Sequence, residues 1–122
     1  MEITVTERDG ISILSFKGDL QFSNWQEMVN AASKLINDGK KEIVVSWDQV
    51  GYIDSSALGA LVSIHKLFQR IPDGKSVIFT TREEHHFIFR QAHFHSFLDI
   101  YDDLDKAMSS FRSIESSTHS TR

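Results

Sequence analysis

The chain has 122 residues, the size of one domain with one hydrophobic core, and 40% of its residues are hydrophobic. Its 13 basic and 17 acidic side chains give a formal net charge of −4, and no Lys or Arg cluster forms a stripe that would neutralise a run of phosphates, which argues against nucleic acid as a direct partner. Cysteine is absent, which excludes disulfides, thiolate catalysis and cysteine-based zinc sites and fits a reducing compartment.

No targeting or membrane segment is recognisable in the sequence. The N-terminus opens directly into a strand-like alternation, without a basic flank, an apolar h-region or a cleavage site. No run approaches the roughly 20 apolar residues of a membrane span. The sequence therefore predicts a protein of the cytoplasm that does not insert into membranes.

The first third of the chain predicts a hairpin followed by a helix. Residues 1–8 alternate apolar and polar side chains, Asp9-Gly10 is a turn signal, and residues 11–17 alternate again. A helix is expected over about residues 24–36, which carry one apolar face and are followed by Asn-Asp-Gly. Ser23 or Asn24 is the expected cap of this helix.

Strands and helices are expected to alternate in the rest of the chain. A strand at 42–47 precedes a helix that ends at the breaker sequence IPDG, and the later elements are a strand at 76–80, a helix at 83–94, a short strand at 98–101 and a helix at 104–114. This order predicts an α/β fold: a mixed sheet that opens with a hairpin, has right-handed crossovers and is packed with about four helices. The domain is expected over residues 1–115, and the polar residues 116–122 are expected to be a frayed tail.

The most informative stretch is the point where the strand pattern gives way to the helix pattern, at Asp54, Ser55 and Ser56. The first N–H groups of a helix need oxygen acceptors, and Asp and Ser supply them best. Capping is therefore the simplest interpretation of these three residues, and the residue types alone do not say which of them is the cap.

Residues 52–59, with the sequence YIDSSALG, resemble the signature of STAS domains, the anti-sigma factor antagonist family, whose usual form is an apolar pair followed by D-S-[ST]-G-L-G. The resemblance extends to the opening hairpin with its Gly18-Asp19-Leu20 exit, and to the closing order of strand, helix, short strand and helix. It implies a STAS-like fold and a bacterial, single-domain regulator that is not an enzyme and needs no cofactor or metal.

The resemblance also implies a phosphorylation switch. In that family a serine kinase, which is also an anti-sigma factor, phosphorylates the serine directly after the aspartate, and a PP2C-like phosphatase reverses the modification. By position this serine is Ser55, with Ser56 as the second choice. The unphosphorylated form is expected to bind the kinase and so to free the sigma factor, and phosphorylation is expected to break the complex.

The expected partner-binding surface surrounds this serine, and the protein is expected to be a monomer or a weak dimer. The residues assigned to the surface are Asp54, Ser55, Ser56, Ala57, Gly59 and Ala60. A phosphate on Ser55 would add about −1.5 to −2 charges. Removing such a charge from water at an interface costs several kcal/mol, which is enough to decide binding.

Two residues depart from the family pattern. Ala57 replaces the usual Gly of the signature and is expected to place a methyl group at the mouth of the site. Gln21 follows Gly18-Asp19-Leu20 where many relatives carry an acid, so a partner contact made by that acid is in question here.

Three other protein classes could place an Asp-Ser-Ser sequence at the start of a helix. A receiver domain phosphorylated on Asp54 would need an acidic pair after the first strand to hold Mg²⁺, and a hairpin turn stands there instead. A serine hydrolase would need a G-x-S-x-G frame, which the serines lack. A STAS domain that serves as a scaffold or accessory subunit of a sensory or transport complex, without phosphorylation, remains open.

Two further groups of residues call for an interpretation. Four histidines cluster late in the chain without a metal-binding motif and are expected to be structural and partly exposed: His85, His86, His93 and His95. Four phenylalanines in the same region are expected to belong mostly to the core and form the second choice for a contact surface: Phe87, Phe89, Phe94 and Phe97.

Overall fold

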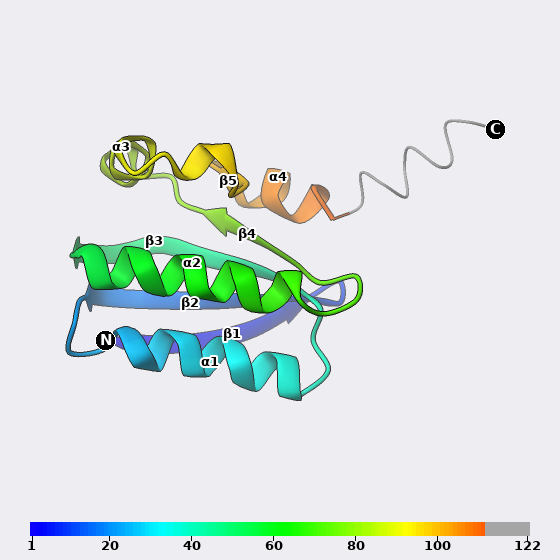
Figure 1. The fold of residues 1–122 in the computed structure, drawn as a ribbon. Coiled ribbons are helices and arrows are strands. Elements are labelled where there is room, and N and C mark those ends of the chain that lie inside the picture. The colour runs from blue at the N-terminus through cyan, green and yellow to red at the C-terminus, as the bar shows by residue number, and fades with distance from the viewer. Residues whose placement is uncertain (112–122) are drawn as a thin grey trace.

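A five-stranded sheet with the order β1-β2-β3-β4-β5 runs through the computed structural model, which describes residues 1–111 (Figure 1). The strands are β1 Glu2–Arg8, β2 Ile11–Leu20, β3 Glu42–Ile53, β4 Lys75–Phe79 and β5 Ile100–Tyr101. The helices are α1 Trp25–Asn37, α2 Ser55–Gln69, α3 Glu83–Gln91 and α4 Leu104–Ser109, with a 3₁₀ turn, η1 Phe94–Ser96, before β5. Strands β1 and β2 are antiparallel and all other neighbours are parallel, which confirms the predicted mixed sheet.

Both faces of the sheet are covered, because the central strands are apolar on both sides. Helices α1 and α2 lie side by side on one face (Figure 1), over inward-pointing residues such as Phe16, Ile43 and Trp47. Trp47 also packs against Phe89 of α3, with ring centroids 5.8 Å apart. Short α4 covers part of the opposite face, where it packs on alternate strand residues such as Val44.

Several boundaries differ from the prediction, and strand β5 is shorter by two residues because it begins at Ile100. Strand β3 continues to Ile53 instead of ending at Trp47, because β2 pairs with it as far as Leu20 opposite Ile53, across two irregularities of register. Helix α3 ends at Gln91 rather than at residue 94, because His93 has a left-handed backbone (φ 60°) that cannot continue a helix. Helix α4 ends at Ser109 instead of residue 114, and Ser110 is its C-cap. The expected tail at 116–122 lies outside the described residues.

This architecture brings the ends of two strands and the beginnings of two helices together at one edge of the molecule. The carboxyl ends of β2 and β3 lie there, beside the first turns of α1 and α2, at the left of Figure 1. The link from β3 to α2 is the single residue Asp54, so Ser55 opens α2 directly where the sheet ends. Residues in loops at this edge are held by strands on one side and helices on the other.

Two glycines offer a test of how tightly the backbone is packed. A Cβ added to Gly74 would lie 2.0 Å from the carbonyl oxygen of Phe68, whereas one added to Gly59 meets nothing within 4 Å. Gly74→Ala should therefore destabilise the fold, by about 1 to 3 kcal/mol, because the α2–β4 loop must shift. Gly59→Ala should stabilise it by up to about 1 kcal/mol, since Ala is the better helix former. Urea unfolding of both variants checks this, and shifts of the same sign would contradict it.

Candidate functional site

The carboxylate of Asp54 is the centre of the predicted site. Its Oδ1 accepts hydrogen bonds from the backbone N–H groups of Ser56 (2.9 Å) and Ala57 (3.2 Å), so Asp54 is the cap of α2. Its Oδ2 accepts from the backbone N–H of Phe22 (3.0 Å), which lies in the loop between β2 and α1. One side chain therefore fixes the start of α2 and the loop before α1 to each other.

A second acid, Asp19, holds the neighbouring backbone in the same way. Its Oδ1 accepts from the backbone N–H of Tyr52 (2.9 Å), close to the end of β3. Its carbonyl oxygen accepts from the side-chain amide of Asn24, whose own oxygen accepts from the N–H of Gln21. Asn24 is thus the residue before α1, as expected, but its side chain braces the loop instead of capping the helix.

Ser55 is exposed, and its hydroxyl makes no hydrogen bond within residues 1–111. Because Asp54 is the cap, neither Ser55 nor Ser56 has that role, which decides a question that the residue types left open. Ser56 is half-buried and donates only its backbone N–H to Asp54. The Ser55 hydroxyl is accordingly available for modification without any loss of contacts in the fold.

The other residues of the predicted surface divide by burial. Gly59 is exposed, whereas Ala57 and Ala60 are buried in the core. The methyl group of Ala57 therefore lies inside the domain and not at the mouth of the site, contrary to expectation. Ala60 lies at the edge of a shallow groove between α1 and α2, and Ala57 contributes to the surface only by packing beneath it.

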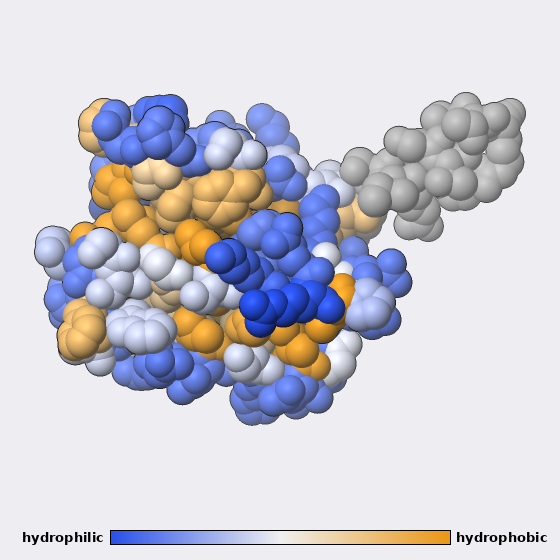
Figure 2. Space-filling model, viewed as in Figure 1, coloured by the Kyte–Doolittle hydropathy of each residue, from blue (hydrophilic) through white to orange (hydrophobic). Residues whose placement is uncertain are grey.

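Two exposed aromatic residues flank Ser55, and sequence patterns gave no sign of them. Phe22 is 75% exposed and Tyr52 is 61% exposed, although both have backbone N–H groups fixed by acids. Figure 2 shows an apolar group that projects at the left margin, where Figure 1 has the loop leading into α1. The surface around Ser55 is thus more aromatic than the motif alone suggests.

A groove of about 360 Å³ lies between α1 and α2, and its lining on α2 begins at Ser56, the residue after Ser55. It is lined by Phe22, Trp25, Ser56, Gly59, Ala60 and Ser63. The α2 residues of this lining recur at helical spacing, so they form one face of the helix. The groove exists because these residues are small and leave the aromatic side chains of the α1 side uncovered.

The histidines do not form a metal site, and two of them are more buried than expected. His85 and His86 are buried, while His93 and His95 are exposed. Within residues 1–111 no three His, Asp or Glu side chains gather closely enough to hold a metal ion. Likewise, none of the helices in that range combines the length and the apolar character that crossing a bilayer requires.

His85 ties α3 to the end of β3. Its Nε2 donates to the carbonyl of Val50 (3.0 Å), so its Nδ1 is the nitrogen that accepts the hydroxyl hydrogen of Thr80 (2.7 Å). Arg82 donates to the same Val50 carbonyl. Burial lowers the pKa of His85, which keeps the ring neutral and this network intact near neutral pH.

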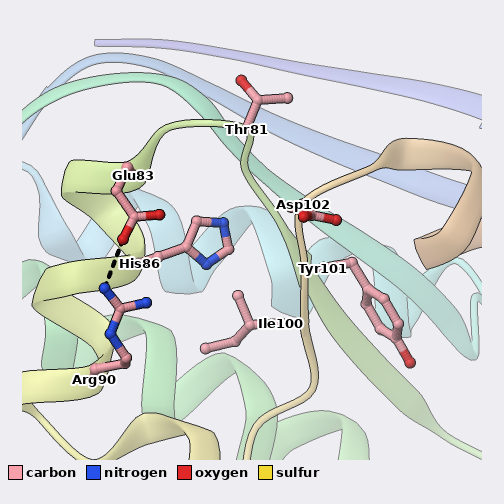
Figure 3. A pocket seen from close by; sticks show the side chains of 7 residues that line it. All are labelled: Thr81, Glu83, His86, Arg90, Ile100, Tyr101 and Asp102. Atoms are coloured by element: carbon pink, nitrogen blue, oxygen red, sulfur yellow. Dashed lines mark hydrogen bonds and ion pairs between the residues drawn. The ribbon is translucent and has the colours of Figure 1, made fainter.

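A second hollow of about 390 Å³ lies at the start of α3 and contains charged side chains (Figure 3). Glu83 pairs with Arg90 on one side, and Thr81 donates to Asp48 on the other. The side chain of His86 points into the hollow between them, and its Nε2 bonds the carbonyl of Thr80. The lining contains two acids, Glu83 and Asp102, and one base, Arg90, so its charges favour neither an anion nor a cation.

The expected aromatic patch is split between core and surface. Phe89 and Phe94 are buried and stack on each other, with ring centroids 5.8 Å apart. Phe87 and Phe97 are 55% and 47% exposed. Figure 2 shows an apolar patch above α2, toward η1 and α3. A contact with another protein at this patch stays a prediction.

Asp54→Ala should destabilise the protein by about 1 to 3 kcal/mol, because it removes a helix cap and leaves the Phe22 N–H without its acceptor. Ser55→Ala is the matched control and should change the stability by less than about 0.5 kcal/mol, since the Ser55 hydroxyl bonds nothing in the described fold. Thermal and urea unfolding measure both. Equal losses for the two variants would contradict the assignment of the cap.

His85 predicts a pH dependence of stability. Because its pKa is lower in the folded than in the unfolded chain, the stabilisation is complete above the unfolded value of about 6.5 and declines as the pH falls below it. The slope from one proton is at most about 1.4 kcal/mol per pH unit. Urea unfolding between pH 7.5 and 5.5 should give a shallower slope for His85→Gln than for the wild type. If stability fell equally with pH in both proteins, His85 would not contribute to the pH dependence. Burial also lowers the pKa of His65, but His65 is present in both proteins and therefore does not affect the comparison.

Comparisons with solved structures match the whole fold at low identity. An anti-sigma factor antagonist from Mycobacterium paratuberculosis aligns with a TM-score of 0.80 and 16% identity, over 91% of this chain and 93% of its own. A Thermotoga maritima protein described provisionally as such an antagonist aligns with a TM-score of 0.81 and 22% identity, over 90% of this chain and 94% of its own. The phosphorylated form of the Bacillus protein SpoIIAA aligns with a TM-score of 0.67 and 12% identity, over 91% of this chain and 100% of its own. The unphosphorylated form of SpoIIAA aligns with a TM-score of 0.68 and 13% identity, over 91% of this chain and 98% of its own.

The sequence itself matches a family. A model of the STAS domain matches residues 2–107, which includes every strand and most of α4. The match covers the hairpin, the Asp-Ser-Ser junction and the closing elements that carried the resemblance. The protein therefore belongs to the STAS domain family.

Proposed function

We propose that this STAS domain is an anti-sigma factor antagonist controlled by phosphorylation of Ser55. In its unphosphorylated form it binds an anti-sigma factor that is also its serine kinase, and so frees the sigma factor. Phosphorylation of Ser55 breaks this complex, and a PP2C-like phosphatase restores it. The protein acts in the cytoplasm through binding alone, as a monomer or weak dimer, without catalytic activity or a cofactor.

The observation that carries this proposal is the free hydroxyl of Ser55 beside a cap that is already complete. A serine kept only for capping would bond the first turn of α2, and Asp54 makes those bonds instead. The fold gains nothing visible from the Ser55 hydroxyl, which is exposed at the edge of the molecule. This favours a role in modification or binding over a structural one.

The surroundings would leave a phosphate on Ser55 as an uncompensated surface charge. Two of the first N–H groups of α2 are already bound to Asp54, so they are not free for a phosphate. The segments 19–33 and 47–65, which build this edge, contain no Lys or Arg. The phosphate would therefore meet a partner directly, next to the negative carboxylate of Asp54, where desolvation costs several kcal/mol.

A change of charge can act here without a change of fold. The chain aligns almost equally well with the phosphorylated and the unphosphorylated forms of SpoIIAA, at TM-scores of 0.67 and 0.68. In this chain the Ser55 hydroxyl has no bond that phosphorylation would break within residues 1–111. Both facts support a switch that works through the interface.

Binding of wild type, Ser55→Ala and Ser55→Asp to purified anti-sigma factors of the same organism tests the proposal. Ser55→Ala should bind within about threefold of wild type, and Ser55→Asp about a hundredfold more weakly, which corresponds to roughly 2.7 kcal/mol. Ser109→Asp is the matched control, because it adds the same charge to an exposed serine on α4, across the sheet. It should bind like wild type.

Phosphosite mapping of the endogenous protein by mass spectrometry completes the test. Phosphate on Ser55, together with the loss of binding by Ser55→Asp alone, would support the switch. Equal binding by all four proteins, with no phosphate at Ser55, would instead make the domain a scaffold or accessory subunit. Phosphate on Ser56 with none on Ser55 would move the modified position by one residue.

A further inference from the structure

Phe22 is the most exposed of the large hydrophobic side chains in residues 1–111, at 75%, yet its backbone is firmly held. Its N–H is bound to Asp54, and the loop around it is closed by bonds from Asn24 N and Trp25 N to the carbonyl of Gln21 (3.0 and 2.9 Å). A rigid backbone that presents an aromatic side chain to water loses little entropy when that side chain is buried by a partner.

Phe22 forms one end of the groove between α1 and α2. Trp25 lines it beyond Phe22, and Gly59 lines the opposite side, where a Cβ would meet nothing within 4 Å. The volume of about 360 Å³ is enough for an apolar side chain of a partner to lie against both aromatic rings. Contacts of this kind, with an aromatic anchor next to a pocket, dominate the affinity of many interfaces.

The charge of this edge selects among possible occupants. This edge carries three acids, Asp19, Glu27 and Asp54, and neither of the two segments that form it contains Lys or Arg. A fourth acid of these segments, Asp48, lies farther back in β3 and binds Thr81 instead. Anionic lipid would be repelled by this surface, and so would the same surface of a second copy of the chain. The complementary occupant is a protein surface that presents an apolar side chain with Lys or Arg beside it.

The groove and Ser55 share one side of α2. Gly59 lies four residues after Ser55, so the two positions are neighbours on the helix surface. A phosphate on Ser55 would therefore stand at the mouth of the groove. A partner side chain seated in the groove would bring its own backbone close to that phosphate.

We propose that Phe22 and the groove over Gly59 form the anchor site for the anti-sigma factor, which inserts an apolar side chain flanked by Lys or Arg. This inference rests on the proposed function and names the residues that give the complex its affinity. Phe22 supplies the contact area, Gly59 supplies the space, and the three acids of the edge orient the partner. Ser55 then controls the site because it lies at its mouth.

Two variants test the anchor from opposite sides. Phe22→Ser removes the exposed ring, and Gly59→Leu fills the groove from within, in a direction where the fold has open space. The purified anti-sigma factors of the same organism are tested one at a time. Each variant should bind the factor that the wild type binds about 30-fold or more weakly than the wild type does. Val5→Ser is the matched control: it removes a 45% exposed apolar side chain from β1 and should stay within about threefold of wild type.

The salt dependence gives a second readout. The association rate of the wild type should fall steeply as NaCl is raised, since the acidic edge steers a basic partner. Phe22→Ser and Gly59→Leu should keep that salt dependence while their complexes dissociate faster. Circular dichroism and thermal unfolding of each variant exclude loss of the fold as the cause.

The outcomes separate this inference from the proposed function. If wild type and Val5→Ser bind while Phe22→Ser and Gly59→Leu lose affinity, the anchor is supported. If Ser55→Asp loses binding but both groove variants bind like wild type, the anchor is overturned and the switch stands. If the wild type binds none of the anti-sigma factors, the proposed function fails and the anchor fails with it.

Discussion

The three hydrogen bonds of the Asp54 carboxylate are the contacts on which the rest of the site depends. They satisfy the first turn of α2 and, through Phe22, fix the loop that precedes α1. Hydrogen bonds to a charged acceptor contribute about 1.5 to 3 kcal/mol each when formed, and the loss of a cap alone costs about 0.5 to 2 kcal/mol. Because one carboxylate serves two segments, the position of the exposed Phe22 and the start of the helix are set together. Ser55 is relieved of a structural role by the same contacts.

Asp19 repeats this arrangement one strand away. Its carboxylate holds the backbone of Tyr52, and its carbonyl is bound by Asn24, so the end of β2 is tied both to the end of β3 and to the start of α1. The approach is close enough that a Cβ on Gly51 would lie 2.8 Å from the carboxylate oxygen of Asp19. The edge is therefore a set of short loops that cross-link each other through acids, and the aromatic side chains that it exposes stand on a fixed backbone.

The order of elements and the mixed sheet followed from the sequence because hydrophobic period and turn residues are local properties. The extent of β3 did not, since Asp48, Gln49 and Gly51 interrupt the apolar run. The strand continues past them because β2 pairs with Gln49, Val50 and Ile53. The cap was also undetermined: Asp54, Ser55 and Ser56 are all good acceptors, and the choice depends on backbone geometry (φ −118°, ψ −176° at Asp54). The exposure of Phe22 and the burial of His85 and His86 depend on contacts with distant segments, which no local pattern encodes.

The rigid backbone and the acidic character of this edge determine whether a phosphate on Ser55 would act on the free protein or on a complex. A phosphate on Ser55 finds little to bind in the free protein, because the cap already uses Asp54 and no basic side chain lies in the two segments of this edge. Its interaction with the helix dipole is worth only about 0.3 to 1 kcal/mol at an exposed site. At an interface the same charge costs several kcal/mol, because it is desolvated beside another acid. In the proposed switch the difference between these energies would appear only in the complex. A rigid edge would then be an advantage, because it would keep the proposed anchor in place and let the charge alone decide binding.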